Sequence, residues 1–297
     1  MKRFWCLFFV LWPIAACVLC WIAPDMGWWF PSNGPTGMTA ASPLGLKIDS
    51  LYYMILYIVT ATFIGTQVAL GYALFQGAAA TDEGNTHKAW YSHGSHKLEV
   101  IWTVVPSCVL LFIALYQLDV VAEFRVKSVF PQETRDRGAL AEVTARQFEW
   151  RIRYPGLNEH GKPLKLMPKP QPTDLYTVND LHAPVGTPVM IILQSGDVQH
   201  AFFLPELRIK QDAVPGLDIP IWFEANKSGQ YNLLCAELCG WGHYKMKARL
   251  VAEPEEKFVE FLRDLTKQQN YDGVPEVATA VAAEPAISDQ PSAVSQK

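Results

Sequence analysis

The chain has 297 residues, 50% of them hydrophobic and 18% charged, and its 25 Lys and Arg against 29 Asp and Glu give a net charge of −4. That charge does not fit a nucleic-acid-binding protein, which carries a basic stripe, and six unevenly spaced cysteines do not form a disulfide scaffold. Because charged residues are sparse before residue 122 and ordinary after it, the composition excludes a purely cytosolic enzyme and predicts a membrane protein with one water-soluble domain.

The first apolar segment, Phe4–Ala23, has two interpretations. It carries no charge and follows two basic residues. The stretch Ile14-Ala-Ala-Cys17 is similar to a bacterial lipoprotein signal, in which Cys17 would be lipidated. The apolar residues that continue beyond Cys17 instead suit an uncleaved anchor of about 20 residues. Residues 1–23 are therefore predicted to be a signal or a first membrane anchor, and the anchor is favoured.

Two further charge-free segments, 51–75 and 100–118, predict transmembrane helices. A helix that spans a bilayer needs about 20 mostly apolar residues, and both segments approach or exceed that length. Pro106 lies inside the second segment, where a helix in lipid tolerates it. Residues 24–121 are thus predicted to form a transmembrane helical hairpin.

The basic residues predict the topology of the chain. Lys2 and Arg3 keep the N-terminus inside, and Lys88 and Lys97 place the loop between the two helices inside as well. Everything after about residue 121 then lies outside. In a bacterium this is the periplasmic side of the inner membrane.

Residues 122–267 predict a β-sandwich, because short β-branched and apolar runs alternate with Pro, Gly, Asp and Asn turns. These runs are 188–193, 201–204, 219–223 and 231–234, and residues 245–251 alternate between apolar and basic side chains. A short amphipathic helix should follow, with Phe258, Phe261, Leu262 and Leu265 at helical spacing. Residues 268–297, rich in Ala, Glu, Pro, Ser and Gln, predict a disordered tail.

One segment of the soluble part gathers residues that bind soft metal ions. Cys235, Cys239, His243 and Met246 lie within 12 residues, and His200 stands 35 residues upstream of the first cysteine. A disulfide or a zinc site are the plain alternatives, but a structural zinc site does not use Met. Thiolate, imidazole and thioether together favour copper.

The number of cysteines indicates which kind of copper site this is. A mononuclear blue-copper centre uses one Cys, two His and a weak axial Met. Two thiolates can instead bridge two copper ions, each of which takes one His, with Met246 and a backbone carbonyl as weak outer ligands. One electron shared over two bridged ions suits electron transfer, and the site offers no open position for a substrate.

The motif Cys-x3-Cys-x3-His-x2-Met, with Asp197-Val-x-His200 upstream, resembles subunit II of bacterial haem–copper cytochrome c oxidases, which bears the dinuclear copper-A centre. The likeness covers about residues 45–262 and includes Glu99–Pro106, Gln147–Trp150 and Lys210–Gly216. It implies a cupredoxin-like sandwich behind a hairpin that packs on subunit I. The implied copper ligands are His200, Cys235, Cys239, His243 and Met246 through their side chains, and Glu237 through its carbonyl.

The resemblance also implies a function. Electrons from a c-type cytochrome would enter the copper centre and pass to haem in subunit I, where oxygen is reduced to water with proton translocation. The Glu237 carboxylate would hold magnesium at the subunit I interface, and Glu99 would collect protons. Position alone leaves Glu99 equally well explained as a helix-start residue.

Two departures from the family pattern concern the electron donor and the subunit interface. Phe148 stands where the family usually has the first Trp of Gln-Trp-x-Trp, and Leu217 stands where it has Arg. Phe148 and Trp150 remain the expected electron-entry residues, and Asp197 is expected to attract a basic cytochrome.

Three other functions compete with this interpretation. Quinol oxidase subunits II lack the copper cysteines, and nitrous oxide reductase needs a propeller domain that does not fit in 297 residues. A membrane-anchored copper electron carrier with another partner stays as the alternative. The remaining histidines are not expected to be ligands, and His160 and His182 are expected to lie in loops.

Overall fold

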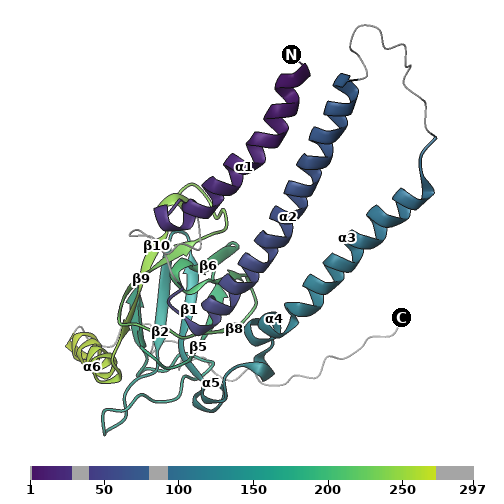
Figure 1. Ribbon diagram of the computed structural model, residues 1–297. Coiled ribbons are helices and arrows are strands. Elements are labelled where there is room, and N and C mark those ends of the chain that lie inside the picture. The colour runs from purple at the N-terminus through teal and green to yellow at the C-terminus, as the bar shows by residue number, and fades with distance from the viewer. Residues whose placement is uncertain (1, 29–39, 80–92, 272–297) are drawn as a thin grey trace, which may run out of the picture.

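The computed structural model describes residues 2–28, 40–79 and 93–271, in which three long helices lead into one β-domain (Figure 1). The long helices are α1 (Lys2–Met26), α2 (Pro43–Ala79) and α3 (His96–Tyr116). The shorter helical segments are α4 (Leu118–Arg125), α5 (Gln132–Arg137), α6 (Glu255–Tyr271) and the single 3-10 turns η1 (Lys127–Val129), η2 (Pro205–Leu207) and η3 (His243–Lys245).

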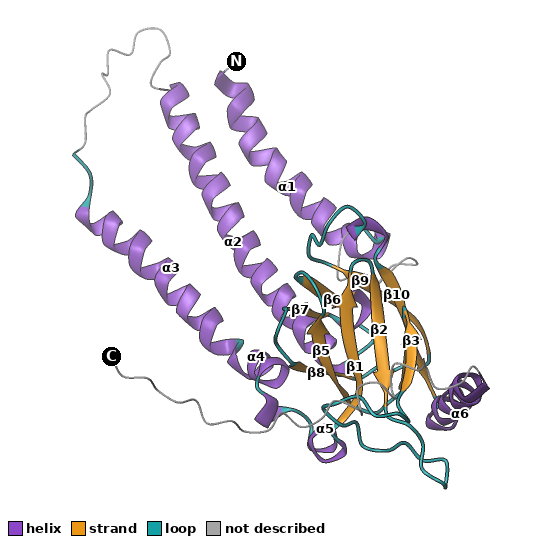
Figure 2. Cartoon of the chain, turned by 180° about the vertical axis from the view of Figure 1, so that it is seen from behind, coloured by secondary structure: helices purple, strands orange, loops and turns teal. Residues whose placement is uncertain are grey.

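Two helices confirm the predicted hairpin. The spans Pro43–Gly77 and His96–Tyr116 are long and apolar enough to cross a membrane. None of the residues of α3, all of which the structure describes, is buried, as lipid-facing side chains require. The first segment forms the continuous helix α1 beside α2 (Figures 1 and 2). A signal and an anchor both form such a helix, so the choice between them stays a prediction.

Helix α2 begins at Pro43, eight residues before the predicted start. Ser42 precedes it, and its Oγ accepts a hydrogen bond from the backbone N–H of Gly45 at 2.8 Å. A Ser cap followed by Pro at the first helical position is a strong start signal. The predicted start was too late because charged residues interrupt the apolar pattern between 43 and 50.

The β-domain is a sandwich of two five-stranded sheets (Figure 2), which confirms the predicted fold class. The first sheet has the order β3 (Leu175–Val178), β2 (Glu149–Tyr154), β1 (Ala139–Arg146), β5 (Val189–Ser195) and β8 (Ile219–Phe223). The second has the order β4 (Asp180–Pro184), β10 (Lys247–Glu253), β9 (Gly229–Cys235), β6 (His200–Leu204) and β7 (Ile209–Ala213). The pairs β1–β5 and β4–β10 are parallel, and the other neighbours are antiparallel.

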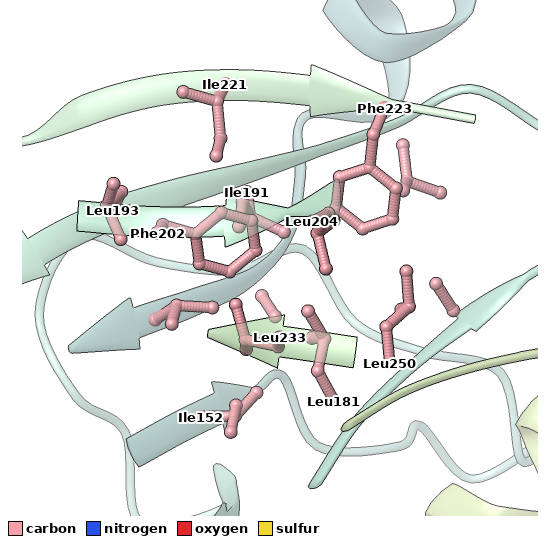
Figure 3. Close-up of a cluster of buried hydrophobic side chains, with 14 of the residues drawn as sticks. Ile152, Leu181, Ile191, Leu193, Phe202, Leu204, Ile221, Phe223, Leu233 and Leu250 are labelled. Carbon is pink, nitrogen blue, oxygen red and sulfur yellow. The ribbon is translucent and has the colours of Figure 1, made fainter. Parts of the chain in front are cut away.

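The core lies between the two sheets (Figure 3). Ile191 and Ile221 from the first sheet face Phe202 and Leu233 from the second, and all four are buried. Burial of such side chains contributes about 1.5–3 kcal/mol each before conformational entropy is counted. This packing holds the ends of the strands, and hence the loops between them, in fixed positions.

Helix α6 packs against β3 and β4, which are edge strands of the two sheets. Phe258, Leu262 and Leu265 are buried, as the predicted amphipathic helix requires. The helix extends to Tyr271, a few residues beyond the predicted domain end at 267, and the rest of the predicted tail, 272–297, lies outside the described residues.

His182 is not a loop residue, so that prediction was wrong. It belongs to β4, and its Nδ1 lies 2.7 Å from Glu253 Oε1 while its Nε2 lies 3.3 Å from Asp180 Oδ1. Its ring stacks on Phe261 of α6 with a centroid distance of 3.7 Å. The short polar sequence Asp-Leu-His-Ala-Pro lacks the apolar run that marks a strand.

Candidate metal centre

Strand pairing brings the predicted metal ligands to one end of the second sheet. His200 is the first residue of β6 and Cys235 the last of β9, and these antiparallel strands pair through Phe202 and Cys235. The loop 236–246 then returns to β10 and carries the remaining ligands. Two neighbouring strand ends and one loop therefore supply the whole predicted set.

The donor atoms lie in a row, with the two thiols in the middle and one imidazole nitrogen beside each thiol. Cys235 Sγ and Cys239 Sγ are 3.9 Å apart, and both cysteines are free thiols. His200 Nδ1 lies 3.9 Å from Cys235 Sγ, and His243 Nδ1 lies 3.8 Å from Cys239 Sγ. Each sulfur thus has one imidazole nitrogen beside it.

The weak outer donors complete the group. Met246 Sδ lies 3.8 Å from Cys239 Sγ, and the Glu237 carbonyl oxygen lies 3.2 Å from Cys235 Sγ. His200, Cys239 and Met246 are buried. The structure therefore brings all six predicted ligands together, three of them buried and the other three half-buried.

The thiols differ in acidity before any metal binds. Burial opposes ionisation of Cys235, but hydrogen bonds to His200 and to the backbone outweigh it and lower the pKa of this thiol to about 6. Burial and the neighbouring Cys235 charge raise the pKa of Cys239 to about 11. Because copper binds thiolates, its binding to both sulfurs would release whatever protons they still carry.

Asp197 orients the His200 ring. Its Oδ1 lies 2.8 Å from His200 Nε2, and its two oxygens accept hydrogen bonds from the backbone N–H groups of Gln147 at 2.7 Å and Val198 at 2.6 Å. Although burial opposes ionisation, these bonds lower the pKa of Asp197 below its usual value. When a metal ion replaces the Nδ1 proton, the hydrogen bond to Asp197 would keep the other proton on Nε2 and hold Nδ1 toward the ion.

The donor set fits copper. The ligand atoms of His200, Cys235 and Cys239 lie within 4.8 Å of one another and could hold a metal ion. Two sulfur anions, two imidazoles and a thioether suit a soft metal ion and not magnesium or calcium, which prefer oxygen.

The expected electron-entry residues occupy different depths. Trp150 is completely buried against Phe202, with its ring 6.3 Å from the His200 ring. Phe148 is half-buried beneath the ligand loop. Gln147 supports the same loop by donating from Nε2 to the Cys239 carbonyl at 2.6 Å.

One exposed aromatic residue near the ligands was missed by the sequence analysis. Trp241 lies between Cys239 and His243, its ring contacts Phe148 at a centroid distance of 5.0 Å, and it is 76% exposed. A large apolar residue between two glycines inside a ligand loop was the signal that could have identified it.

The residues expected to handle protons and magnesium lie apart from one another. Glu99 stands in the first turn of α3, at the end of the hairpin farthest from the sandwich (Figure 1). Its Oε2 lies 3.9 Å from His96 Nδ1. Glu237 is half-buried in the ligand loop, and Leu217, the second departure from the family pattern, is exposed after β7.

Two family models match the chain. The model described as cytochrome c oxidase subunit II, periplasmic domain, matches residues 142–252, and the one described as cytochrome c oxidase subunit II, transmembrane domain, matches residues 34–120. Together they cover the hairpin and most of the sandwich.

Two curated proteins and one solved structure are also similar to this chain. Cytochrome c oxidase subunit 2 of Synechocystis sp. is 28% identical over 276 residues, covering 79% of this chain and 77% of the relative. The Cereibacter sphaeroides protein of the same name is 28% identical over 279 residues, covering 86% and 87%. The solved periplasmic domain of subunit II of cytochrome oxidase from Bradyrhizobium japonicum is 25% identical with a TM-score of 0.36, covering 43% of this chain and 93% of that one.

The matched residues include every predicted copper ligand and both membrane-spanning helices. The chain therefore belongs to the cytochrome c oxidase subunit II family and is a membrane subunit of a cytochrome c oxidase complex.

Proposed function

We propose that this subunit holds two copper ions and is the point at which electrons enter the oxidase from a c-type cytochrome. One observation carries the proposal: two thiols 3.9 Å apart, each with one imidazole nitrogen at 3.8–3.9 Å. This near-symmetric arrangement supplies equal strong donors to two ions, which a mononuclear site does not need.

The bound copper would supply a reversible one-electron couple shared by two ions. Residues of this chain hold the predicted copper ligands in fixed positions, and three of the ligands are shielded from water. His200 and Cys235 are fixed by paired strands, and Asp197 holds the His200 ring by a hydrogen bond. Because the ligands are fixed before the electron arrives, little reorganisation accompanies its transfer.

The onward path leads to the partner subunit. Electrons would pass to haem in subunit I, where oxygen is reduced to water with proton translocation. The Glu237 carboxylate would hold magnesium at that interface, while its carbonyl serves copper. Gln147 links Asp197 to the ligand loop, because its backbone N–H donates to Asp197 and its side chain donates to the Cys239 carbonyl. Phe148 and Trp150 follow Gln147 in the chain and lie on this same side of the site.

The proposed placement in the membrane follows from the same elements. The sandwich would lie on the periplasmic side of the bacterial inner membrane, with α2 and α3 crossing the lipid. Glu99 would then face the opposite side, where protons enter subunit I. Its place at the far end of the hairpin supports this (Figure 1).

The order of electron transfer tests the proposal. The purified oxidase complex should be mixed rapidly with reduced mitochondrial cytochrome c while the copper and haem absorption bands are followed. We expect the copper band to change before any haem of subunit I is reduced. Reduction of haem before copper, or no oxidation of the cytochrome, would contradict the proposal.

A further inference from the structure

Trp241 is an exposed aromatic side chain that the copper ligands do not explain. It is 76% exposed, and it stands two residues after Cys239 and two before His243. Leu238 and Tyr244 of the same loop are 79% and 74% exposed. Large apolar side chains gathered on one short loop mark a surface that another molecule covers.

The Trp241 ring is held in place although it is exposed. Its ring makes an edge-to-face contact with Phe148, and Lys245 Nζ lies 4.3 Å from the ring centroid. Such aromatic and cation–π contacts each stabilise an exposed ring modestly. Trp241 thus presents a preformed surface, and a partner pays little conformational entropy to bind it.

Phe148 supports this ring from below. The two glycines beside Trp241 leave room for it, because a Cβ at Gly242 would lie 2.5 Å from Phe148 Cδ2 and one at Gly240 would lie 3.2 Å from Phe148 Cε1. The close approach of Phe148 therefore requires glycine at 242, whereas at Gly240 a Cβ would lie 2.7 Å from Gln147 Nε2 and the backbone φ is +133°.

We propose that Trp241 is the residue that contacts the electron donor, and that Phe148 positions Trp241. This rests on the proposed function of the subunit. The donor we infer is a haem protein with an apolar surface around its exposed haem edge. Three observations favour it: the patch is apolar and aromatic, it lies on the ligand loop itself, and His200, Cys239 and Met246 beneath it are closed to solvent.

The other aromatic residues near the site are less suited to this contact. Trp150 is completely buried, and Phe148 has the ligand loop and Trp241 over it. A donor that approaches the copper ions from this side meets Trp241 first. Trp is also one of the three side chains, with Tyr and Arg, in which the residues that dominate binding energy at protein interfaces are enriched.

The proposed reaction is the transfer of one electron from the donor to the copper site. One electron would leave the ferrous haem iron of the donor, which would become ferric, and would reduce the copper pair that Cys235 and Cys239 would hold. No covalent bond forms or breaks, and no proton is transferred. Trp241 shortens the distance between the two cofactors by being the point of contact.

The test compares Trp241→Ala and Trp241→Phe in the purified oxidase complex, with reduced mitochondrial cytochrome c as the donor. Tyr176→Ala is the matched control, because Tyr176 is an exposed aromatic on β3. We expect the second-order rate of copper reduction to fall about tenfold or more in Trp241→Ala and to be partly restored in Trp241→Phe. The control should keep the wild-type rate.

Two further measurements separate docking from damage to the site. The copper spectrum, and copper reduction by ascorbate with a small mediator, should be unchanged in Trp241→Ala. The affinity of the metal-free full chain for cytochrome c, measured by calorimetry, should fall by a similar factor. A changed copper spectrum with unchanged affinity would contradict the proposal.

The outcomes also distinguish this inference from the proposed function. If cytochrome c reduces the copper of the wild-type complex and of Trp241→Ala at the same rate, only the role of Trp241 is wrong. Loss of subunit I from the Trp241→Ala complex would show that Trp241 is a subunit contact and would overturn the inference. If the wild-type copper is not reduced, the proposed function fails and the inference with it.

Discussion

Asp49 of α2 and Arg208, which follows η2, form a two-point ion pair although they lie 159 positions apart. Arg208 Nε donates to Asp49 Oδ1 at 2.8 Å and its Nη2 donates to Oδ2 at 3.1 Å. The two side chains are only 4% and 14% exposed. Since η2 directly follows β6, this pair links the membrane hairpin to the strand that begins with His200, a predicted metal ligand.

Loss of one partner of this pair should destabilise the protein strongly. Arg208→Met leaves the Asp49 carboxylate buried without its partner, which costs about 3–5 kcal/mol. The double variant Asp49→Leu with Arg208→Met removes both charges and should recover most of that loss. Thermal unfolding of the full chain in detergent measures the effect.

The control is Lys47→Met, which breaks the ion pair of Lys47 with Glu123 at the same junction. Lys47 is 53% exposed, and such pairs contribute about 0–1 kcal/mol. Equal loss of stability in Arg208→Met and Lys47→Met would show that the buried pair has no special role.

Asp197→Asn should weaken copper binding. The amide cannot accept the three hydrogen bonds of the carboxylate with the same strength, so the His200 ring loses its fixed orientation. Loss of such a supporting partner costs about 10–100-fold in metal affinity. Competition with a copper(I) chelator measures this, and Asp264→Asn on α6 is the control. An unchanged affinity would mean that strand pairing alone orients His200.

His182 should make the stability of the protein depend on pH. Burial opposes its protonation, but hydrogen bonds to Asp180 and Glu253 outweigh burial and raise its pKa above the ordinary value of about 6.5. Protonated His182 therefore stabilises the fold fully below that ordinary pKa. The contribution is lost as pH rises through the raised pKa.

The comparison is between the wild type and His182→Gln across pH 6 to 9, by thermal unfolding of the full chain. Arg249, which also binds Asp180, stays charged throughout this range. We expect the stability advantage of the wild type to shrink as pH rises, whereas His160→Gln in an exposed turn changes nothing. Parallel pH profiles for wild type and His182→Gln would rule out this linkage.

The sequence alone could bring the predicted metal ligands together because most of them lie in one loop. The spacing within this loop itself indicates a metal site, through Cys235, Cys239, His243 and Met246. Only His200 is brought to the loop by strand pairing. The hairpin was predictable because lipid demands long apolar helices.

Contacts between distant segments could not be predicted in this way. The start of α2 was missed because Lys47 and Asp49 interrupt the apolar pattern, and their partners Glu123 and Arg208 are far away in the chain. The contact of Trp241 with Phe148 spans 93 positions and depends on the loop conformation. Strands such as β4 and β7 lacked apolar runs because they lie at sheet edges and carry polar residues.

Glu99→Gln should slow oxygen consumption by the assembled oxidase. The amide cannot carry a proton, whereas it preserves the size of the side chain and the start of α3. The copper spectrum and the rate of the first electron transfer into copper should stay as in the wild type. Asp119→Asn, an acid in the first turn of α4, is the control and should not slow turnover. Normal turnover in Glu99→Gln would leave Glu99 as a helix-start residue.

The proposal that Cys235 and Cys239 would together hold two copper ions is tested most directly by two measurements on the full chain purified in detergent, its copper content and its electron paramagnetic resonance spectrum. We expect two copper ions per chain and a hyperfine pattern of one electron shared by two copper nuclei, lost in Cys235→Ser and in Cys239→Ser. A single copper ion per chain, or zinc in its place, would contradict the account.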